Sequence, residues 1–309
     1  MPILRKAIKM KHNFEPSIYY NNFGSYEPVL TIASGDSVTT STADAFGNGR
    51  SGEPVAKRSN PLTGPFFIED AEPGDQLVVH LENILPNRDH GYTMSGIAPH
   101  IVDGDFVNEL PERSMLKWSV DVNDGTATLF DEFAQPSHLT ISLDPMLGCI
   151  GVAPERGQAI STATSGQYGG NMDYRLVTPG TTMLLPVFMP GALFFVGDGH
   201  AVQGDGEIVG TGIEISMDVT FSIELRKNVH AHWPRMEPDR HIITLGNARP
   251  LDQALQHSTT ELVRWLCSDY GYDARGASHL LGQALEYDIG NVFDPAYTVA
   301  AKISKELIT

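Results

Sequence analysis

Five polar side chains that can bind a metal ion or transfer protons fall within ten residues, separated by glycines. The segment reads GDGHAVQGDGE and carries Asp198, His200, Gln203, Asp205 and Glu207. It follows the apolar run ALFFV, which is typical of a buried strand. Carboxylates and an imidazole that converge at the end of a strand can bind a metal ion or catalyse proton transfer. A tight turn with solvated acids is the alternative interpretation.

Two other segments offer oxygen ligands. In GGNMD, the glycines allow close backbone approach, so we predict Asp173 as a metal ligand and Asn171 as a substrate-binding residue; a turn capped by this pair is the alternative. In TADAFG, Asp44 is a further hard oxygen donor. With His200 and Asp198, Asp173 and Asp44 complete the predicted metal ligands.

The catalytic roles follow from side-chain chemistry. Glu207 is the preferred general acid or base and Asp205 the next, while His200 could act as a ligand or a base. Gln203 could orient the substrate amide or satisfy a buried loop. The sequence leaves open which of Asp198, Asp205 and Glu207 binds the metal and which transfers protons.

Other candidates are weaker on their local context. Cys149 is flanked by apolar residues and fits a small buried side chain better than a nucleophile. His80 and His100 are further candidate ligands with open roles. Asp36 in SGD and Asp75 in EPGD are typical of turns that introduce strands.

The elements that must position these residues are mainly strands. Between residues 14 and 245, short apolar runs are bounded by Gly, Pro, Asp and Asn, and MDVTFSIEL alternates strictly. We therefore predict a mainly β fold with an antiparallel, β-sandwich-like catalytic core over residues 1–245.

The character of the sequence changes after Pro250. LDQALQHSTTELVRWLCSDY has helical spacing, and a second helical stretch is expected to begin near Ser278 as its N-cap. The tail AYTVAAKISKEL fits either a strand or a helix. We predict a smaller, helical α/β C-terminal part over residues 246–309, packed on the core as one structural unit.

Charge and composition limit the partners. The 309 residues carry a formal net charge of −17, which argues against nucleic acid and anionic membrane surfaces as partners. No apolar stretch has the length of a signal-peptide core or a membrane helix, so we expect a cytoplasmic protein. Cys149 and Cys267 are the only cysteines and indicate no disulfide framework.

Six segments in a fixed order resemble the acetamidase/formamidase family of amide hydrolases. They are SGDSVTTSTADAFG, NPLTGP, AEPGDQL, PMLGCIGVAP, GGNMD and GDGHAVQGDGE. Residues from about 86 to 140 match weakly, and the C-terminal third more loosely than the core. The resemblance implies a sandwich-like β core, hydrolysis of small amides to carboxylate and ammonia, bound divalent metal ions and homo-oligomers.

The leading hypothesis is metal-dependent hydrolysis of a short linear amide such as acetamide or formamide. Bound metal can generate a nucleophilic water and polarise the carbonyl. Imidazole with carboxylates fits zinc best, with manganese, calcium or magnesium as alternatives. We expect a homodimer or larger homo-oligomer. The alternatives are a hydrolase of another small carbonyl compound and a non-catalytic, metal-stabilised β-protein that binds a small ligand.

Overall fold

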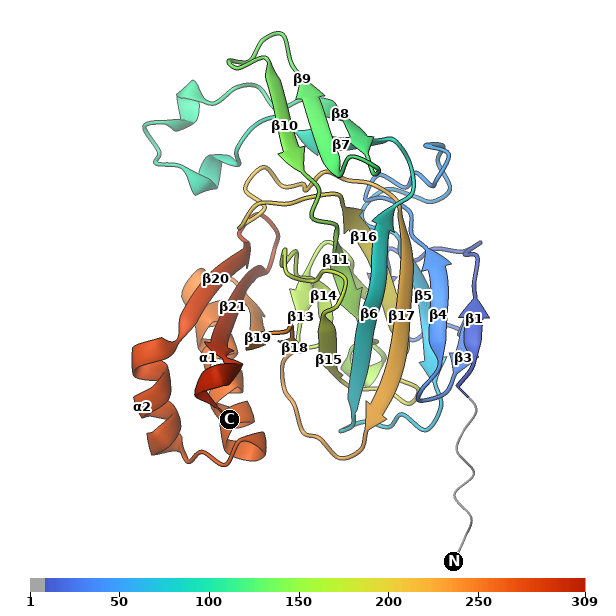
Figure 1. The fold of residues 1–309 in the computed structure, drawn as a ribbon, viewed down its shortest axis with the longest axis vertical. Coiled ribbons are helices and arrows are strands. Elements are labelled where there is room, and N and C mark those ends of the chain that lie inside the picture. The colour runs from blue at the N-terminus through green and yellow to red at the C-terminus, as the bar shows by residue number, and fades with distance from the viewer. Residues whose placement is uncertain (1–8, 309) are drawn as a thin grey trace, which may run out of the picture.

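The computed structural model describes residues 9–308 and consists mainly of β-sheet, with two helices near the C-terminus (Figure 1). Its largest sheet has nine strands in the order β1-β4-β17-β6-β15-β18-β19-β21-β20. These are β1 (Lys11–Asn13), β4 (Ser37–Ser41), β6 (Gln76–Pro86), β15 (Thr182–Pro186), β17 (Met217–Arg226), β18 (Arg235–Glu237), β19 (His241–Ala248), β20 (Glu286–Asn291) and β21 (Tyr297–Ser304). Every neighbouring pair is antiparallel except β1 with β4.

A six-stranded sheet, ordered β13-β14-β11-β16-β5-β3, packs against the first. Its strands are β3 (Leu30–Ile32), β5 (Leu62–Ile68), β11 (Met146–Gly151), β13 (Ser165–Gly166), β14 (Gly169–Asn171) and β16 (Phe194–His200). The ring of Phe221 on β17 lies 5.3 Å from Phe66 on β5 and 5.2 Å from Phe194 on β16, centroid to centroid. Interlocked aromatic rings between two sheets are the core of a sandwich. The predicted antiparallel, sandwich-like fold is confirmed.

The alternation in MDVTFSIEL produces the face of β17 that closes this core. Met217, Val219, Phe221 and Ile223 are fully buried, whereas the residues between them are partly exposed. Side chains of a strand point alternately to its two faces, so a period of two places one apolar set inside. The strand predicted from the alternation in the sequence is confirmed.

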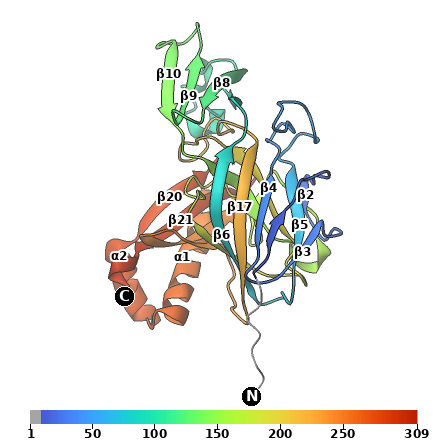
Figure 2. The same ribbon diagram turned by 45° about the vertical axis from the view of Figure 1, so that its right-hand side comes forward.

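Residues 86–142 form a separate layer at one end of the sandwich, projecting away from it (Figures 1 and 2). This four-stranded antiparallel sheet contains β7 (His90–Met94), β8 (Met115–Asp121), β9 (Thr126–Phe130) and β10 (His138–Ser142). A two-stranded pair joins β2 (Asn22–Phe23) and β12 (Ile160–Ser161). Short 3₁₀ helices cover Pro99–Ile101, Val107–Glu109, Glu155–Gly157 and Lys305–Leu307.

The C-terminal part contains α1 (Leu251–Asp269) and α2 (Ala274–Ala284), which pack on the end of the nine-stranded sheet. The helix near Ser278 begins earlier than predicted, because Asp273 is the N-cap and accepts the Gly276 backbone N–H at 2.7 Å. The ambiguous tail is the strand β21, paired between β19 and β20. The nine-stranded sheet therefore runs through the predicted boundary between residues 245 and 246.

Neither α-helix within residues 9–308 is long and apolar enough to cross a membrane. Cys149 is buried and Cys267 exposed, and both are free thiols.

Candidate active site

The site forms at the end of β16, where glycines alternate with chemically active residues. A Cβ atom on Gly199 would lie 2.2 Å from Met217 Cγ, and one on Gly197 would lie 2.8 Å from Leu62 Cδ2. Glycine is required on this crowded face, so the intervening Asp198 and the terminal His200 present their side chains on the other face. GDGH is therefore the end of a strand in which only glycine, with hydrogen as its side chain, fits on the inner face.

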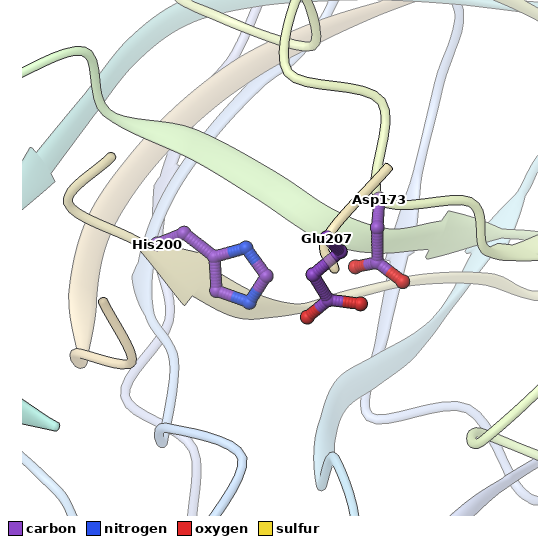
Figure 3. Close-up of side chains that lie close together, drawn as sticks. All are labelled: Asp173, His200 and Glu207. Atoms are coloured by element: carbon purple, nitrogen blue, oxygen red, sulfur yellow. The ribbon is translucent and has the colours of Figure 1, made fainter. Parts of the chain in front are cut away.

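Two groups of buried acidic and imidazole side chains meet at His200. One comprises Asp173, His200 and Glu207 (Figure 3), and the other comprises Asp198, His200 and Glu214. Within each group the candidate ligand atoms lie within 4.8 Å of one another. Asp173, Asp198 and Glu207 all have positive φ angles, of 44°, 57° and 48°. Strained backbone at residues that carry chemistry is a common feature of functional sites.

Gln203 fixes the orientation of the His200 ring through Nδ1. Its amide nitrogen donates to the backbone carbonyl of Asp173 at 2.6 Å, so its oxygen faces His200 Nδ1 at 2.9 Å. Nδ1 must then carry the hydrogen, and Nε2 is the nitrogen directed to the carboxylates. Nε2 lies 3.1 Å from Glu214 Oε1 and 3.5 Å from Asp198 Oδ1. Gln203, predicted as a substrate-binding residue, is placed as the residue that fixes the imidazole.

The loop between β20 and β21 closes the site from the C-terminal part. The side-chain amide of Asn291 lies 2.7 Å from Asp173 Oδ2, 2.8 Å from Glu207 Oε2 and 3.0 Å from Asp294 Oδ2. Asn171 also donates to Asp294, at 2.5 Å. Neutral amide donors therefore separate the carboxylates, but no Lys or Arg side chain pairs with Asp173, Asp198, Glu207, Glu214 or Asp294 within the described residues.

The crowding of buried acids shifts their protonation. Burial, followed by repulsion from Asp198 and Asp294, raises the pKa of Asp173 well above its usual range. Burial and the Asp173 charge do the same to the pKa of Glu207, and burial raises the pKa of Glu214 to about 8. Burial disfavours the imidazolium form of His200, but attraction by Glu214 and Asp198 outweighs it and raises the His200 pKa. The carboxyl groups of Asp173, Glu207 and Glu214 therefore keep their protons to a higher pH than exposed acids do.

Four buried atoms of this cluster lack a hydrogen-bond partner among the described residues. They are Asp173 Oδ1, Asp198 Oδ1, His200 Nε2 and Glu214 Oε2. Buried polar atoms normally have hydrogen-bond partners, so a converging set of unpaired carboxylate oxygens and an imidazole nitrogen points to a ligand of these atoms. Carboxylate oxygens and an imidazole nitrogen are ligands for a divalent cation, so these residues fit a metal ion.

A pocket of about 290 Å³ opens beside the cluster. Asp198, Glu207, Glu214 and Asp294 line its acidic side, and Asn60 and Asn171 contribute amides. Phe46 and Arg58 line it as well, from the loop that connects β4 to β5. The unsatisfied ligand atoms and the residues that could touch a small molecule therefore belong to one site.

The family model described as Acetamidase/Formamidase family matches residues 25–159 and 156–301. The chain belongs to the acetamidase/formamidase family. Its fold is similar to that of an acetamidase from Yersinia enterocolitica, with 33% sequence identity, a TM-score of 0.84, and coverage of 99% of this chain and 94% of that one. A predicted acetamidase/formamidase from Thermoanaerobacter tengcongensis is 27% identical, with a TM-score of 0.85 and 97% of each chain covered.

A putative formamidase from Schizosaccharomyces pombe is 26% identical over 220 residues, which are 55% of this chain and 53% of that protein. The chain thus spans about half the length of the curated relatives of this family that it matches. The match of the family model across most of the chain confirms the resemblance inferred from the six segments.

Two residues that the sequence predicts for the site, Asp44 and Asp205, lie outside both carboxylate groups. Asp44 is fully buried, but its carboxylate accepts a hydrogen bond from Arg88 Nη2 at 2.5 Å and another from the Asn48 backbone at 2.8 Å. Its charge is therefore already compensated. Asp205 is half-exposed and pairs with Arg175 at 2.7 Å. Both residues therefore stand apart from the two carboxylate groups, and the predicted roles of Asp44 as a metal ligand and of Asp205 as an acid or base stay predictions.

The other candidates, His80, His100 and Cys149, belong to neither carboxylate group. His80 hydrogen-bonds Thr182, and the exposed His100 contacts the Val292 carbonyl, so neither joins a carboxylate group. Cys149 is fully buried beneath the site and contacts Asn171 Oδ1 at 2.6 Å. Burial, with repulsion from Asp198, raises the pKa of its thiol well above the usual value, which opposes a thiolate nucleophile.

Sequence reasoning did not select Glu214, Asn291, Asp294 or Asn60. Glu214 lies in an apolar segment and reaches the site through isolated β-bridges to His200 and Tyr92. Asn291 begins the turn NVFD, in which its Oδ1 accepts the backbone N–H groups of Phe293 and Asp294. That Asx turn was the only local signal available, and it indicates a turn, not a site.

Proposed function

We propose that this protein hydrolyses a small primary amide to a carboxylate and ammonia with the help of a bound divalent cation. The observation that carries the proposal is the convergence of four unsatisfied ligand atoms, from Asp173, Asp198, His200 and Glu214, beside an open pocket. Membership of the acetamidase/formamidase family, and similarity to an acetamidase and a formamidase, support amides as the substrate class.

When bound, a divalent cation would lower the pKa of water and polarise the amide carbonyl. Asp173, Asp198, His200 and Glu214 would hold it, since these residues carry the unpartnered atoms. Gln203 keeps Nε2 of His200 available by accepting the hydrogen of Nδ1. One imidazole among carboxylates favours zinc, with manganese, calcium and magnesium as the alternatives.

Glu207 would move the protons. It lines the pocket, and its Oε2 accepts a hydrogen bond from Asn291, which keeps the carboxyl group in place. In this role Glu207 takes a proton from the attacking water and delivers it to the amide nitrogen, which leaves as ammonia. Asn171, which also lines the pocket, would orient the substrate amide.

The deciding experiment measures metal content and ammonia release from acetamide and formamide on the same preparation. We expect activity that disappears on chelation and returns with one metal, and a His200→Ala variant that loses both metal and activity. His80→Ala is the matched control, because His80 is a histidine outside both carboxylate groups.

Two outcomes would count against the proposal in different ways. Ammonia release that survives both chelation and His200→Ala refutes the metal mechanism and leaves an amidase. Stabilisation by amides without any product would indicate a binding protein instead. The predicted homo-oligomeric state and cytoplasmic location remain predictions, testable by light scattering and cell fractionation.

A further inference from the structure

The pocket has one positively charged side chain in its lining. Of the residues 9–308, Arg58 is the only Lys or Arg among the pocket-lining residues, which include four acids. Arg58 is exposed and forms no ion pair with a described carboxylate, unlike Arg88 and Arg50, which pair with Asp44 and Asp218. A guanidinium at a pocket mouth without an internal partner is available for an anionic ligand.

The backbone around Arg58 is held firmly. The Asn21 side-chain nitrogen lies 3.2, 2.9 and 2.8 Å from the carbonyl oxygens of Lys57, Arg58 and Ser59. Thr162 donates to the Ser59 carbonyl from the other side, at 2.8 Å. Two residues after Arg58, Asn60 donates directly to Asp198 at 3.2 Å. The loop that carries Arg58 is therefore tied to the carboxylate cluster, and the fold holds the Arg58 backbone beside that cluster.

The side chain of Arg58 rests on an aromatic wall. Its guanidinium carbon lies 5.9 Å from the ring centroid of Phe46, which also lines the pocket. Stacking on an aromatic face orients the planar fork while leaving its N–H donors free. The pocket volume of about 290 Å³ is near the lower end for ligand sites and exceeds what acetamide or formamide needs. A longer substrate can extend from the cluster towards this residue.

We infer that Arg58 selects substrates and that the preferred substrate is a short primary amide with a carboxylate at its other end. This inference rests on the proposed amidase function and deepens it. The amide occupies the acidic cluster, and the distal carboxylate pairs with the Arg58 guanidinium beside Phe46. Water cleaves the C–N bond, so the products are a dicarboxylate and ammonia.

The test compares succinamate with 4-oxopentanamide, in which a methyl ketone replaces the carboxylate. For the full-length, metal-loaded protein, Arg58→Gln should lower kcat/KM for succinamate by about tenfold or more, because a charge-assisted pair is lost. The same variant should change kcat/KM for 4-oxopentanamide by less than about twofold. Arg58→Lys should recover part of the succinamate activity, since it restores the charge without the planar fork.

Lys57→Gln is the matched control, because Lys57 is the exposed neighbour, carries the same charge and does not line the pocket. It should leave both substrates unaffected. An equal effect of Lys57→Gln and Arg58→Gln, or no effect of either, overturns the inference while amidase activity stands.

Binding of succinate, the product, separates this inference from the proposed function. Calorimetry should show that Arg58→Gln weakens succinate binding by about tenfold. If no amide is hydrolysed but succinate binding still depends on Arg58, the proposed function fails and the anion site remains. If succinate binds equally to the protein and to Arg58→Gln, the anion site is refuted whatever the amidase result.

Discussion

Carboxylates are buried in two different ways in this protein. At Asp44, full burial is accompanied by Arg88, whose side chain is itself only 3% exposed and donates at 2.5 Å. At the end of β16, Asp173, Asp198 and Glu214 are equally buried, yet no described arginine or lysine pairs with them. The two sites lie close enough for Asp44 to influence Glu214 electrostatically.

The difference separates a structural charge from a functional one. Burying an ion costs several kcal/mol unless a partner compensates it, and Arg88 compensates Asp44 within the fold. The acids around His200 have no such partner from Lys or Arg: burial raises the pKa values of Asp173, Glu207 and Glu214, and a bound cation would favour their ionised forms. A buried acid is therefore informative about function only once its partner is known.

The largest expected effect comes from breaking the compensated pair. Arg88→Met should lower the free energy of unfolding by about 3–5 kcal/mol, because it leaves Asp44 buried and unpaired. Urea unfolding measures the loss. The double variant Arg88→Met with Asp44→Leu should recover part of it, since no buried charge then remains. A double variant as unstable as Arg88→Met alone would contradict this explanation.

The next largest effect concerns the acids around His200, which have no Lys or Arg partner. At Gly148, a Cβ atom would lie 2.3 Å from Asp173 Oδ1 and 2.6 Å from Asp198 Oδ2. Gly148→Ala should therefore displace both carboxylates and reduce bound metal and amidase activity about a hundredfold, which corresponds to about 2.7 kcal/mol. Metal analysis and ammonia release would measure it.

Gly204→Ala is the control for this substitution, because a Cβ atom there meets no atom within 4 Å. Its metal content and activity should match those of the unmodified protein. Equal losses in both variants would show that the backbone near β16 tolerates no added methyl group, and that the contact with the two carboxylates is not the cause.

The comparison also explains how far the sequence predicted the site. The glycine alternation of GDGH and its preceding apolar run are local, so Asp198 and His200 could be found from the sequence. Asp44 had an equally favourable local context, but the residue that occupies its carboxylate, Arg88, lies 44 positions away. Residue type and spacing do not reveal which buried acid receives a permanent partner.

Glu214 and Asn291 could not be predicted for the same physical reason: their partners are distant in the sequence. Glu214 and Asn291 reach the cluster through single β-bridges, to His200 and Gly206 respectively, which depend on the tertiary fold. By contrast, the strands of the core were predictable because period-two burial, as in β17, is a property of contiguous residues. The sandwich could be inferred from short patterns, whereas the closing wall of the site could not.

A third, smaller effect tests whether the acids near His200 truly lack compensation. Glu214→Gln replaces an acid, whose pKa burial raises to about 8, with a neutral amide of the same shape. In metal-free protein at pH 7 it should raise the free energy of unfolding by about 1–3 kcal/mol, because folding no longer has to bury or protonate an acid that is ionised in the unfolded chain. The same variant should lose metal-dependent activity. Destabilisation of the metal-free protein by Glu214→Gln would mean that His200 already compensates this acid.

The smallest expected effect concerns Asp75, a buried acid compensated by the half-exposed Lys227 and by two backbone N–H groups. Burial opposes its ionisation, but hydrogen bonds from Lys227 Nζ at 2.5 Å, Asn228 N at 3.0 Å and Glu72 N at 2.8 Å prevail and lower its pKa. A lowered folded-state pKa gives stability that is complete above the unfolded value, near 3.9, and is lost as the pH falls through the folded value.

Asp75→Asn should thus lower the free energy of unfolding by about 1–2 kcal/mol at pH 7, and this difference should shrink below about pH 4. Unfolding measured by urea at several pH values provides the curve. Asp205→Asn is the comparison, since the half-exposed pair with Arg175 should contribute less than about 0.5 kcal/mol at every pH. A penalty for Asp75→Asn that stays constant down to pH 2 would assign the stability to packing. If the loss of unfolding free energy in Asp75→Asn disappears at low pH, the fold stabilises the ionised form of Asp75, as it does that of Asp44.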